Sequence, residues 1–180
     1  MKEEIRRRLI NAGALAVGFA QAGEISPEVH KEYQTWIEEG HQGEMSYLER
    51  HLPLRQHTDN VLKEARTVIS MAFGYAPKEW QPKSLPVIAV YAYGEDYHLV
   101  LREILNPVVK EFQKEYGGKW RICIDSAPMA ERFWAVKSGI AKRGINGSVI
   151  IHKGGSLCFL VEILTTQSIE ADHPSKETFG

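Results

Sequence analysis

The sequence has few cysteines and no long apolar run, and each absence excludes a class of protein. Only two cysteines, Cys123 and Cys158, occur among 180 residues. Both lie in apolar stretches, which favours buried free thiols and a cytoplasmic protein over a disulfide framework. No apolar stretch approaches the roughly 20 residues that span a bilayer, so an integral membrane protein is excluded. The charged N-terminus lacks the apolar core of a signal peptide.

An excess of charge of one sign is also missing. The 22 Lys and Arg side chains nearly balance 23 Asp and Glu, for a net charge of -1. This balance argues against a protein that coats nucleic acid non-specifically, although it allows a local basic patch. The seven histidines show no metal-ligand spacing, and no Walker, GxGxxG, HExxH, GxSxG or EF-hand pattern is present. The sequence therefore predicts no dedicated metal site.

The pattern of helices and strands predicts a single α/β (α+β) domain with a mixed sheet of about five strands flanked by helices. Amphipathic helices are indicated at residues 3–12 and 96–116, and Pro107 should kink or split the second. Ser26 should cap another helix that Pro27 opens. The near-continuous β-type run 67–75 predicts a central strand covered on both faces. Further strands are expected at 15–20, 87–93, 119–124, 148–152 and 157–165, the last two forming a hairpin around Gly154–Gly155, before a polar tail that should wrap or fray.

One acidic side chain lies at a position that suits chemistry. Asp125 follows a predicted strand and precedes a predicted helix at 129–137. Ends of strands that face a helix N-terminus are where α/β proteins place ligands and acid–base groups. From the residues alone, however, the alternative that Asp125 or Ser126 is a helix N-cap is favoured.

Two other segments have equally open interpretations. Residues 91–98 gather three tyrosines and a histidine, which indicates either the wall of a polar aromatic pocket or a capping turn with aromatics at the edge of the core. Residues 138–148 contain three glycines, the pair Lys142–Arg143 and Asn146. Such a loop can bring backbone N–H groups and cations to a ligand, but a flexible connector with solvated charges is favoured.

The chain resembles the epoxyqueuosine reductase family in the order and spacing of its segments, from about residue 4 to residue 174. Residues 91–98 resemble the family's aromatic-Gly-x-Asp-Tyr-His segment, and residues 125–132 resemble Asp-[ST]-Ala-Pro-x-x-Glu-Arg. The other matching segments are 40–50 followed by Leu54–Arg55 and 67–70, and 155–160.

The resemblance implies a function. Members of this family are cytoplasmic tRNA-modification enzymes that reduce epoxyqueuosine to queuosine at the wobble position of the anticodon, using cobalamin and two [4Fe–4S] clusters. Residues 1–180 would then be the cobalamin-binding catalytic domain, a nitroreductase-like, DUF1730-like domain. The expected partner of the full-length protein is the anticodon loop of tRNA, while no protein partner is evident and no membrane is expected.

The resemblance also implies roles for particular residues. Asp125 matches the family's proposed proton donor, and a carboxylic acid can supply a proton at neutral pH only if burial raises its pKa. Five residues are expected to contact the corrinoid. Arg55 matches a corrinoid-contacting arginine, and the others lie beside the corrin or face its lower side: Tyr93, His98, Asn146 and Ser148.

The sequence departs from the family pattern in two places. In segment 139–146, Lys142 replaces the family's aromatic residue and Ile145 replaces its lysine. The cysteine series that binds the clusters is absent, so the [4Fe–4S] clusters are expected only on a C-terminal part and the isolated fragment is expected to be inactive. Whether the chain is truncated or a native short homologue stays open.

Two alternatives accompany the hypothesis of a catalytic domain. The chain can instead be a non-catalytic cobalamin-binding or processing module, or a nitroreductase-like flavoprotein. Lys142–Arg143 and the segment from Arg50 to Arg55 are the candidate RNA contacts, because phosphate recognition needs only a local basic cluster.

Overall fold

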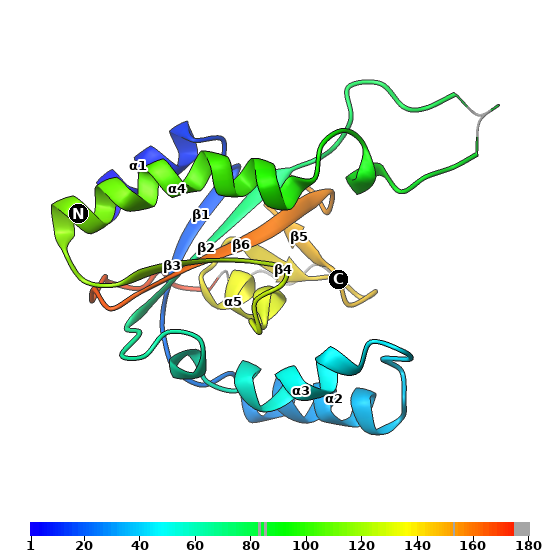
Figure 1. The fold of residues 1–180 in the computed structure, drawn as a ribbon, viewed down its shortest axis with the longest axis horizontal. Helices are drawn as coiled ribbons and strands as arrows, with labels where there is room; N and C mark the ends of the chain where they lie inside the picture. The colour runs from blue at the N-terminus through cyan, green and yellow to red at the C-terminus, as the bar shows by residue number, and fades with distance from the viewer. Residues whose placement is uncertain (83, 85, 153, 175–180) are drawn as a thin grey trace.

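A four-stranded sheet forms the centre of the molecule (Figure 1). The structure is a computed structural model that describes residues 1–82, 84, 86–152 and 154–174. Every neighbouring pair of strands is antiparallel, in the order β1 (Ala16–Gln21), β2 (Thr67–Gly74), β6 (Cys158–Thr165) and β3 (Trp120–Ile124). Seven of the eight residues of β2 are buried, which confirms the prediction of a central strand covered on both faces.

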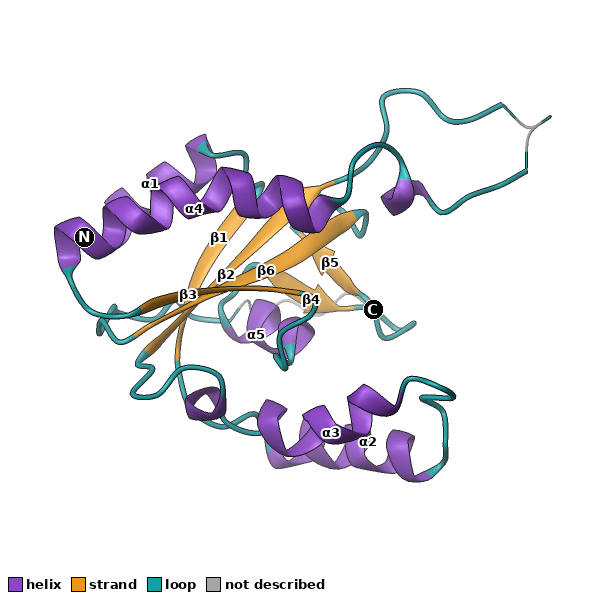
Figure 2. Cartoon of the chain, viewed as in Figure 1, coloured by secondary structure: helices purple, strands orange, loops and turns teal. Residues whose placement is uncertain are grey.

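Two helices cover one face of this sheet (Figure 2). Helices α1 (Lys2–Asn11) and α4 (Tyr97–Tyr116) bury an entirely apolar set of side chains against the strands. The α4 helix runs through Pro107 in one piece, so the expected split does not occur. Leu105 and Val109, on either side of the proline, are both buried in the core, and this packing holds the two halves in one helix.

The other face carries a short helix and a small hairpin. Helix α5 (Glu131–Lys137) lies over the sheet, and strands β4 (Ala141–Arg143) and β5 (Val149–Ile151) pair with each other in a second sheet. The expected strand at 148–152 therefore forms, but the prediction that it pairs with the last strand was wrong. Strand β6 already has β2 on one edge and β3 on the other, so it has no free edge to offer.

Small residues allow α5 to approach the sheet closely. Gly18 of β1 lies under the end of this helix, and a Cβ atom built there would be 2.3 Å from the backbone oxygen of Ser138. Ser70 and Ala72 continue the small surface on β2, and both are fully buried. The narrow spacing therefore depends on the absence of side chains on this part of the sheet.

Two helices precede β2 and lie beyond α5 in the view of Figure 2. These are α2 (Pro27–Glu38) and α3 (Ser46–Arg55), followed by a single 3-10 turn at Thr58–Asn60. The Ser26 hydroxyl accepts a hydrogen bond from the Val29 backbone N–H at 3.3 Å, and Pro27 is the first helical residue. The predicted cap is confirmed.

The segment between β2 and α4 projects from the body of the molecule (Figure 1). Its residues 83 and 85 lie outside the described residues. The strand expected at 87–93 was wrong, because the segment forms only a 3-10 turn at Val90–Ala92. Val87 and Ile88 are 88% and 55% exposed. The described residues of this segment pair with no strand of either sheet, and a β-favouring composition does not make a strand without such pairing.

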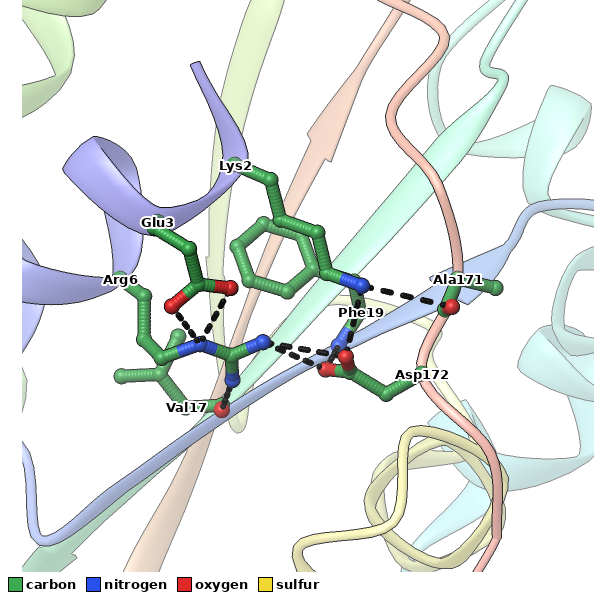
Figure 3. A network of polar contacts seen from close by, with 7 residues as sticks. All are labelled: Lys2, Glu3, Arg6, Val17, Phe19, Ala171 and Asp172. Atoms are coloured by element: carbon green, nitrogen blue, oxygen red, sulfur yellow. Dashed lines mark hydrogen bonds and ion pairs between the residues drawn. The ribbon is translucent and has the colours of Figure 1, made fainter.

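The end of the described chain returns to the N-terminal helix (Figure 3). The Asp172 carboxylate lies 2.8 Å from the Lys2 ammonium group and 3.0 Å from the Arg6 guanidinium group, and it accepts the Phe19 backbone N–H at 3.0 Å. The expectation that the polar tail wraps onto the body is met up to residue 174, and residues 175–180 lie outside the description. Asp172 thus ties α1, β1 and the C-terminal segment together.

The α/β (α+β) class with helices flanking the strands is confirmed, whereas the single mixed sheet of about five strands that the sequence predicted does not form. The strands divide into a four-stranded and a two-stranded sheet, and all the paired strands named above are antiparallel. Among the described residues, no helix combines the length and the apolar character that a membrane crossing requires.

Candidate functional site

Asp125 lies directly after β3, in a backbone conformation that is uncommon for residues other than glycine. Its φ angle is +46°, in the left-handed region that few residues other than glycine adopt. Helix α5 begins only at Glu131, with Ala130 in the N-cap position. The interpretation of Asp125 or Ser126 as a helix cap was therefore wrong. Strain of this kind is often found at functional sites.

Two neighbouring side chains of α4 hold the Asp125 carboxylate. The Tyr97 hydroxyl donates a hydrogen bond to Oδ2 at 2.8 Å, and His98 Nε2 lies 3.3 Å from the same oxygen. The other ring nitrogen of His98 lies 2.8 Å from the Asp96 carboxylate. The Asp125 side chain is nevertheless 61% exposed, so one side of it stays open to a ligand.

An aromatic stack fixes the position of Tyr97. Its ring lies parallel to that of Phe159 on β6, with 4.0 Å between ring centroids and 8° between ring planes. The ring of Tyr75, just after β2, also packs against Phe159, with 4.6 Å between the two ring centroids. Burial, and then the hydrogen bond to Asp125, raise the pKa of Tyr97 well above its ordinary value. Tyr97 therefore remains a hydroxyl donor at neutral pH.

Glu131, the first residue of α5, lies beside Asp125 and is half-buried. Burial, and then the negative charge of Asp125, raise its pKa to about 7, although the positive charges of Arg55 and Arg132 act in the opposite direction. The Glu131 carboxyl also accepts a hydrogen bond from the Asp125 backbone N–H. The sequence analysis did not single out this residue, although it belongs to the matched segment 125–132.

Glu162 on β6 is the deepest acidic group of this region and was also missed. It is fully buried and lies opposite Cys123 on one neighbouring strand and Ser70 on the other. Burial, and then the charge of Glu131, raise its pKa well above the ordinary value. A single acidic residue inside the apolar strand 158–165 was the available signal in the sequence, because a buried carboxyl in a central strand is rare without a function.

The structure brings some of the predicted cofactor residues to Asp125 and leaves others apart. His98 contacts Asp125 directly, and Arg55 at the end of α3 is close enough to Glu131 to lower its pKa. Asn146 and Ser148 lie in the β4–β5 turn, where the Asn146 side chain accepts the Ser148 backbone N–H at 3.1 Å. Tyr93 lies on the projecting segment and donates its hydroxyl hydrogen to Gln81 at 2.9 Å, with no contact to Asp125 among the described residues.

The β4–β5 turn is tied to the start of α5. Arg132 Nη1 donates a hydrogen bond to the Gly147 carbonyl at 3.2 Å, so the turn that carries Asn146 lies next to the helix that begins with Glu131. The segment 138–148 is therefore an ordered hairpin and not the flexible connector that the residues alone favoured.

The basic pair of this hairpin does not form a free cationic surface. Lys142 is 6% exposed, and Arg143 makes an ion pair with Glu32 of α2 at 2.8 Å. The hypothesis that both side chains face RNA phosphates was wrong for Lys142, because a buried side chain cannot reach a phosphate. Among the described residues, no group of three His, Cys, Asp or Glu side chains is placed to hold a metal ion.

Comparison with known proteins gives a consistent result. The family model described as epoxyqueuosine reductase QueG, DUF1730, matches residues 55–126. Epoxyqueuosine reductase of Cellulophaga algicola is 32% identical over 179 residues, covering 98% of this chain and 58% of that protein. The structure of epoxyqueuosine reductase from Streptococcus thermophilus has a TM-score of 0.84 at 26% identity, over 98% of this chain and 49% of that one.

Two further solved structures share the fold at lower identity. A crystal structure of epoxyqueuosine reductase with an epoxyqueuosine-modified tRNA stem loop has a TM-score of 0.82 at 22% identity, over 98% of this chain and 48% of that chain. A reductive dehalogenase, whose structure suggests a mechanism for B12-dependent dehalogenation, has a TM-score of 0.61 at 12% identity, over 99% of this chain and 21% of that chain. Nearly all of this chain is thus similar to epoxyqueuosine reductases, of which it spans about half the length.

Proposed function

We propose that residues 1–180 form the cobalamin-binding catalytic domain of an epoxyqueuosine reductase, with Asp125 as its proton donor. One observation carries the proposal: Asp125 is held in a left-handed conformation, with Tyr97 and His98 on one carboxylate oxygen and an open side toward solvent. It gains weight from the similarity of nearly the whole chain to enzymes of that name. The substrate would be epoxyqueuosine in a tRNA anticodon loop, and the expected location of the protein is the cytoplasm.

The arrangement around Asp125 suits the removal of an epoxide oxygen. Opening the epoxide leaves a negatively charged oxygen that must take up a proton. Both Tyr97 and His98 contact Oδ2, which leaves Oδ1 to face the substrate. Because the side chain is 61% exposed, a ligand can reach the carboxyl from its open side.

The residues near Asp125 offer suitable groups for the side arms of a corrinoid. The Nε atom of Arg55 is buried without a hydrogen-bond partner among the described residues, and the guanidinium group packs over the Tyr33 ring at 4.9 Å. Such a donor fits an acceptor oxygen like those of the corrinoid's carboxamide arms. When bound, cobalamin would supply the reducing centre. The residues proposed to hold it are Arg55, Tyr93, His98, Asn146 and Ser148.

The electrons and the RNA contacts would involve more of the protein than this chain. Iron–sulfur clusters of the [4Fe–4S] type are the expected electron source, and the sequence of this chain has only two cysteines. A solved relative holds an epoxyqueuosine-modified tRNA stem loop, which supports the proposed partner. Arg50, on the exposed side of α3, is a candidate phosphate contact.

Titration of the purified chain with cob(II)alamin tests the proposal. We expect absorbance and electron-spin spectra of the base-off form, with micromolar or tighter affinity. Arg55→Ala should weaken binding about tenfold, which corresponds to the loss of one hydrogen bond to a charged group. Arg50→Ala, on the same helix, should not change it. Absence of binding together with a yellow protein that holds flavin would contradict the proposal and favour the flavoprotein alternative.

The catalytic part of the proposal has its own test. The Asp125→Asn variant would be made in a full-length version of the protein that also holds the iron–sulfur clusters. This variant should bind the corrinoid normally and should lose turnover of epoxyqueuosine stem loops. Near-normal turnover of this variant would remove the assignment of Asp125. A different outcome would favour the non-catalytic binding module: the unaltered protein binds the corrinoid, this binding does not respond to tRNA in any assay, and no turnover is observed.

A further inference from the structure

Three carboxyl groups form a series that leads from the surface into the core. The Asp125 side chain is 61% exposed, Glu131 is half-buried, and Glu162 is fully buried. Neighbouring members of the series interact. The Asp125 backbone N–H donates a hydrogen bond to Glu131, and the negative charge of Asp125 raises the pKa of Glu131. The charge of Glu131 in turn raises the pKa of Glu162. The series therefore connects the proposed proton donor to the interior beneath α5.

The innermost member of the series has no group to stabilise its charge. Neither carboxyl oxygen of Glu162 has a hydrogen-bond partner among the described residues, and the same is true of the Ser70 hydroxyl on the adjacent strand. An isolated ionised carboxylate in such surroundings would cost many kcal/mol, so the group keeps its proton instead. Buried polar groups without a partner are rare in native proteins, and each requires an explanation.

The other titratable and charged groups near Glu131 and Glu162 do not remove the need for a proton on this pair. Cys123, opposite Glu162 on β3, is buried, and burial followed by the charge of Glu162 raises the pKa of its thiol to about 12. The positive charges near Glu131 are Arg55 and Arg132, and they do not remove the effect of burial. At neutral pH the pair Glu131–Glu162 therefore holds at least one proton.

The proposed reaction needs more protons than Asp125 can hold. Converting an epoxide into an alkene breaks both C–O bonds and releases the oxygen as water. The balance requires two electrons, from a reductant of the iron–sulfur class, and two protons. As the proposed donor, Asp125 delivers one proton at a time, and a substrate seated over it keeps bulk water away. The second proton must reach the oxygen from another group.

We propose that Glu131 and Glu162 are a proton store that acts through Asp125, an inference that rests on the proposed function. Asp125 transfers its proton to the epoxide oxygen and becomes a carboxylate. Glu131 then gives its proton to Asp125, and Glu162 returns one to Glu131. Asp125 delivers the second proton to the same oxygen, which leaves as water. Glu131 is also a positioning residue, because its carboxyl accepts the backbone N–H of the strained Asp125.

The store itself can be tested without cofactor or substrate. We would follow the carboxyl carbons of the 13C-labelled chain by NMR from pH 4 to pH 9. Glu131 should titrate near pH 7 and Glu162 should stay protonated at pH 7, while Asp125→Asn should lower the midpoint of Glu131 by removing a negative charge. Glu103→Gln, an exposed change on the opposite side of the sheet, should shift neither. Ionisation of both groups below pH 6, or no response to Asp125→Asn, would overturn the inference.

A second measurement links the store to turnover. In a cluster-containing reductase, Glu131→Gln should keep corrinoid binding and slow turnover at least tenfold. We expect the rate of the unaltered enzyme to fall as pH rises through 7, and Glu131→Gln should abolish this fall. An unchanged pH profile would contradict the relay. If the unaltered protein neither binds corrinoid nor turns over, the proposed function fails, and the NMR titration still decides whether the proton store exists.

Discussion

The two faces of the central sheet are built from different kinds of side chain. On β2, Ile69 and Met71 point toward α1 and α4, whereas Ser70 and Ala72 point toward α5. The first face is closed by large apolar groups, including Leu105 and others of α4. The second combines small residues with buried polar ones, and it holds Glu131 and Glu162 of the candidate site.

This difference shows where stability and function are placed. The apolar face contributes the hydrophobic burial that stabilises the domain. The polar face buries Glu162 and Ser70 without hydrogen-bond partners in the part of the chain that the structure describes, an arrangement that destabilises the fold. A protein can retain such groups because the opposite face of the same strands supplies the compensating stability.

The largest effect should come from a cavity in the apolar face. Leu105→Ala removes a fully buried side chain of α4 and should lower the free energy of unfolding by about 2–5 kcal/mol. Leu99→Ala on the same helix should change it by less than about 0.5 kcal/mol, because Leu99 is 68% exposed. Urea unfolding of the two variants measures both values, and equal losses would contradict the assignment of the core.

The polar face should show a pH dependence that the apolar face lacks. The pKa of Glu131 is raised from 4.5 to about 7, so the folded protein binds more protons than the unfolded chain between these values. The free energy of unfolding should therefore fall as pH rises from about 4.5 to about 7, by roughly 1–3 kcal/mol from this group, and stay constant above. Glu131→Gln should remove this part of the slope. Parallel curves for the two proteins in urea titrations would refute it.

The close approach of α5 can be broken at one glycine. Gly18→Ala places a methyl group 2.3 Å from the Ser138 carbonyl oxygen, so α5 must move, and we expect a loss of about 1–3 kcal/mol. Gly74→Ala is the matched control, because its methyl group meets only the end of the Leu15 side chain at 2.9 Å. Thermal unfolding gives the stabilities. The Gly18 variant should also lower the NMR midpoint of Glu131, and a normal midpoint would mean that α5 has not moved.

The smallest effect concerns the tie between the C-terminal segment and α1. Although burial acts in the opposite direction, hydrogen bonds from Lys2, Arg6 and Phe19 lower the pKa of Asp172. Its contribution is thus present above the ordinary carboxyl pKa and is lost as pH falls through the lowered value. Asp172→Asn should cost about 1 kcal/mol at pH 7 and nothing near pH 2. If the two proteins still differ in the free energy of unfolding at pH 2, packing and not charge holds the segment.

Several parts of the fold could be predicted because their causes are local. The run of buried β-type residues at 67–75, the amphipathic pattern of α4 and the Ser26 cap all depend on neighbours within a few positions. The strand predicted at 87–93 did not form, because its described residues pair with no strand of either sheet. The hairpin predicted around Gly154–Gly155 failed since both edges of β6 are occupied.

The candidate site divides in the same way. The matched segments pointed to Asp125, and the sequence alone carried that information. The contact of Asp125 with Tyr97, the burial of Glu162 beneath α5 and the return of Asp172 to Arg6, 166 residues away, are products of tertiary structure. A sequence determines which residues can form a helix or carry a proton. Only packing decides which of them become neighbours and which lose water, and these two conditions set the electrostatics of the site.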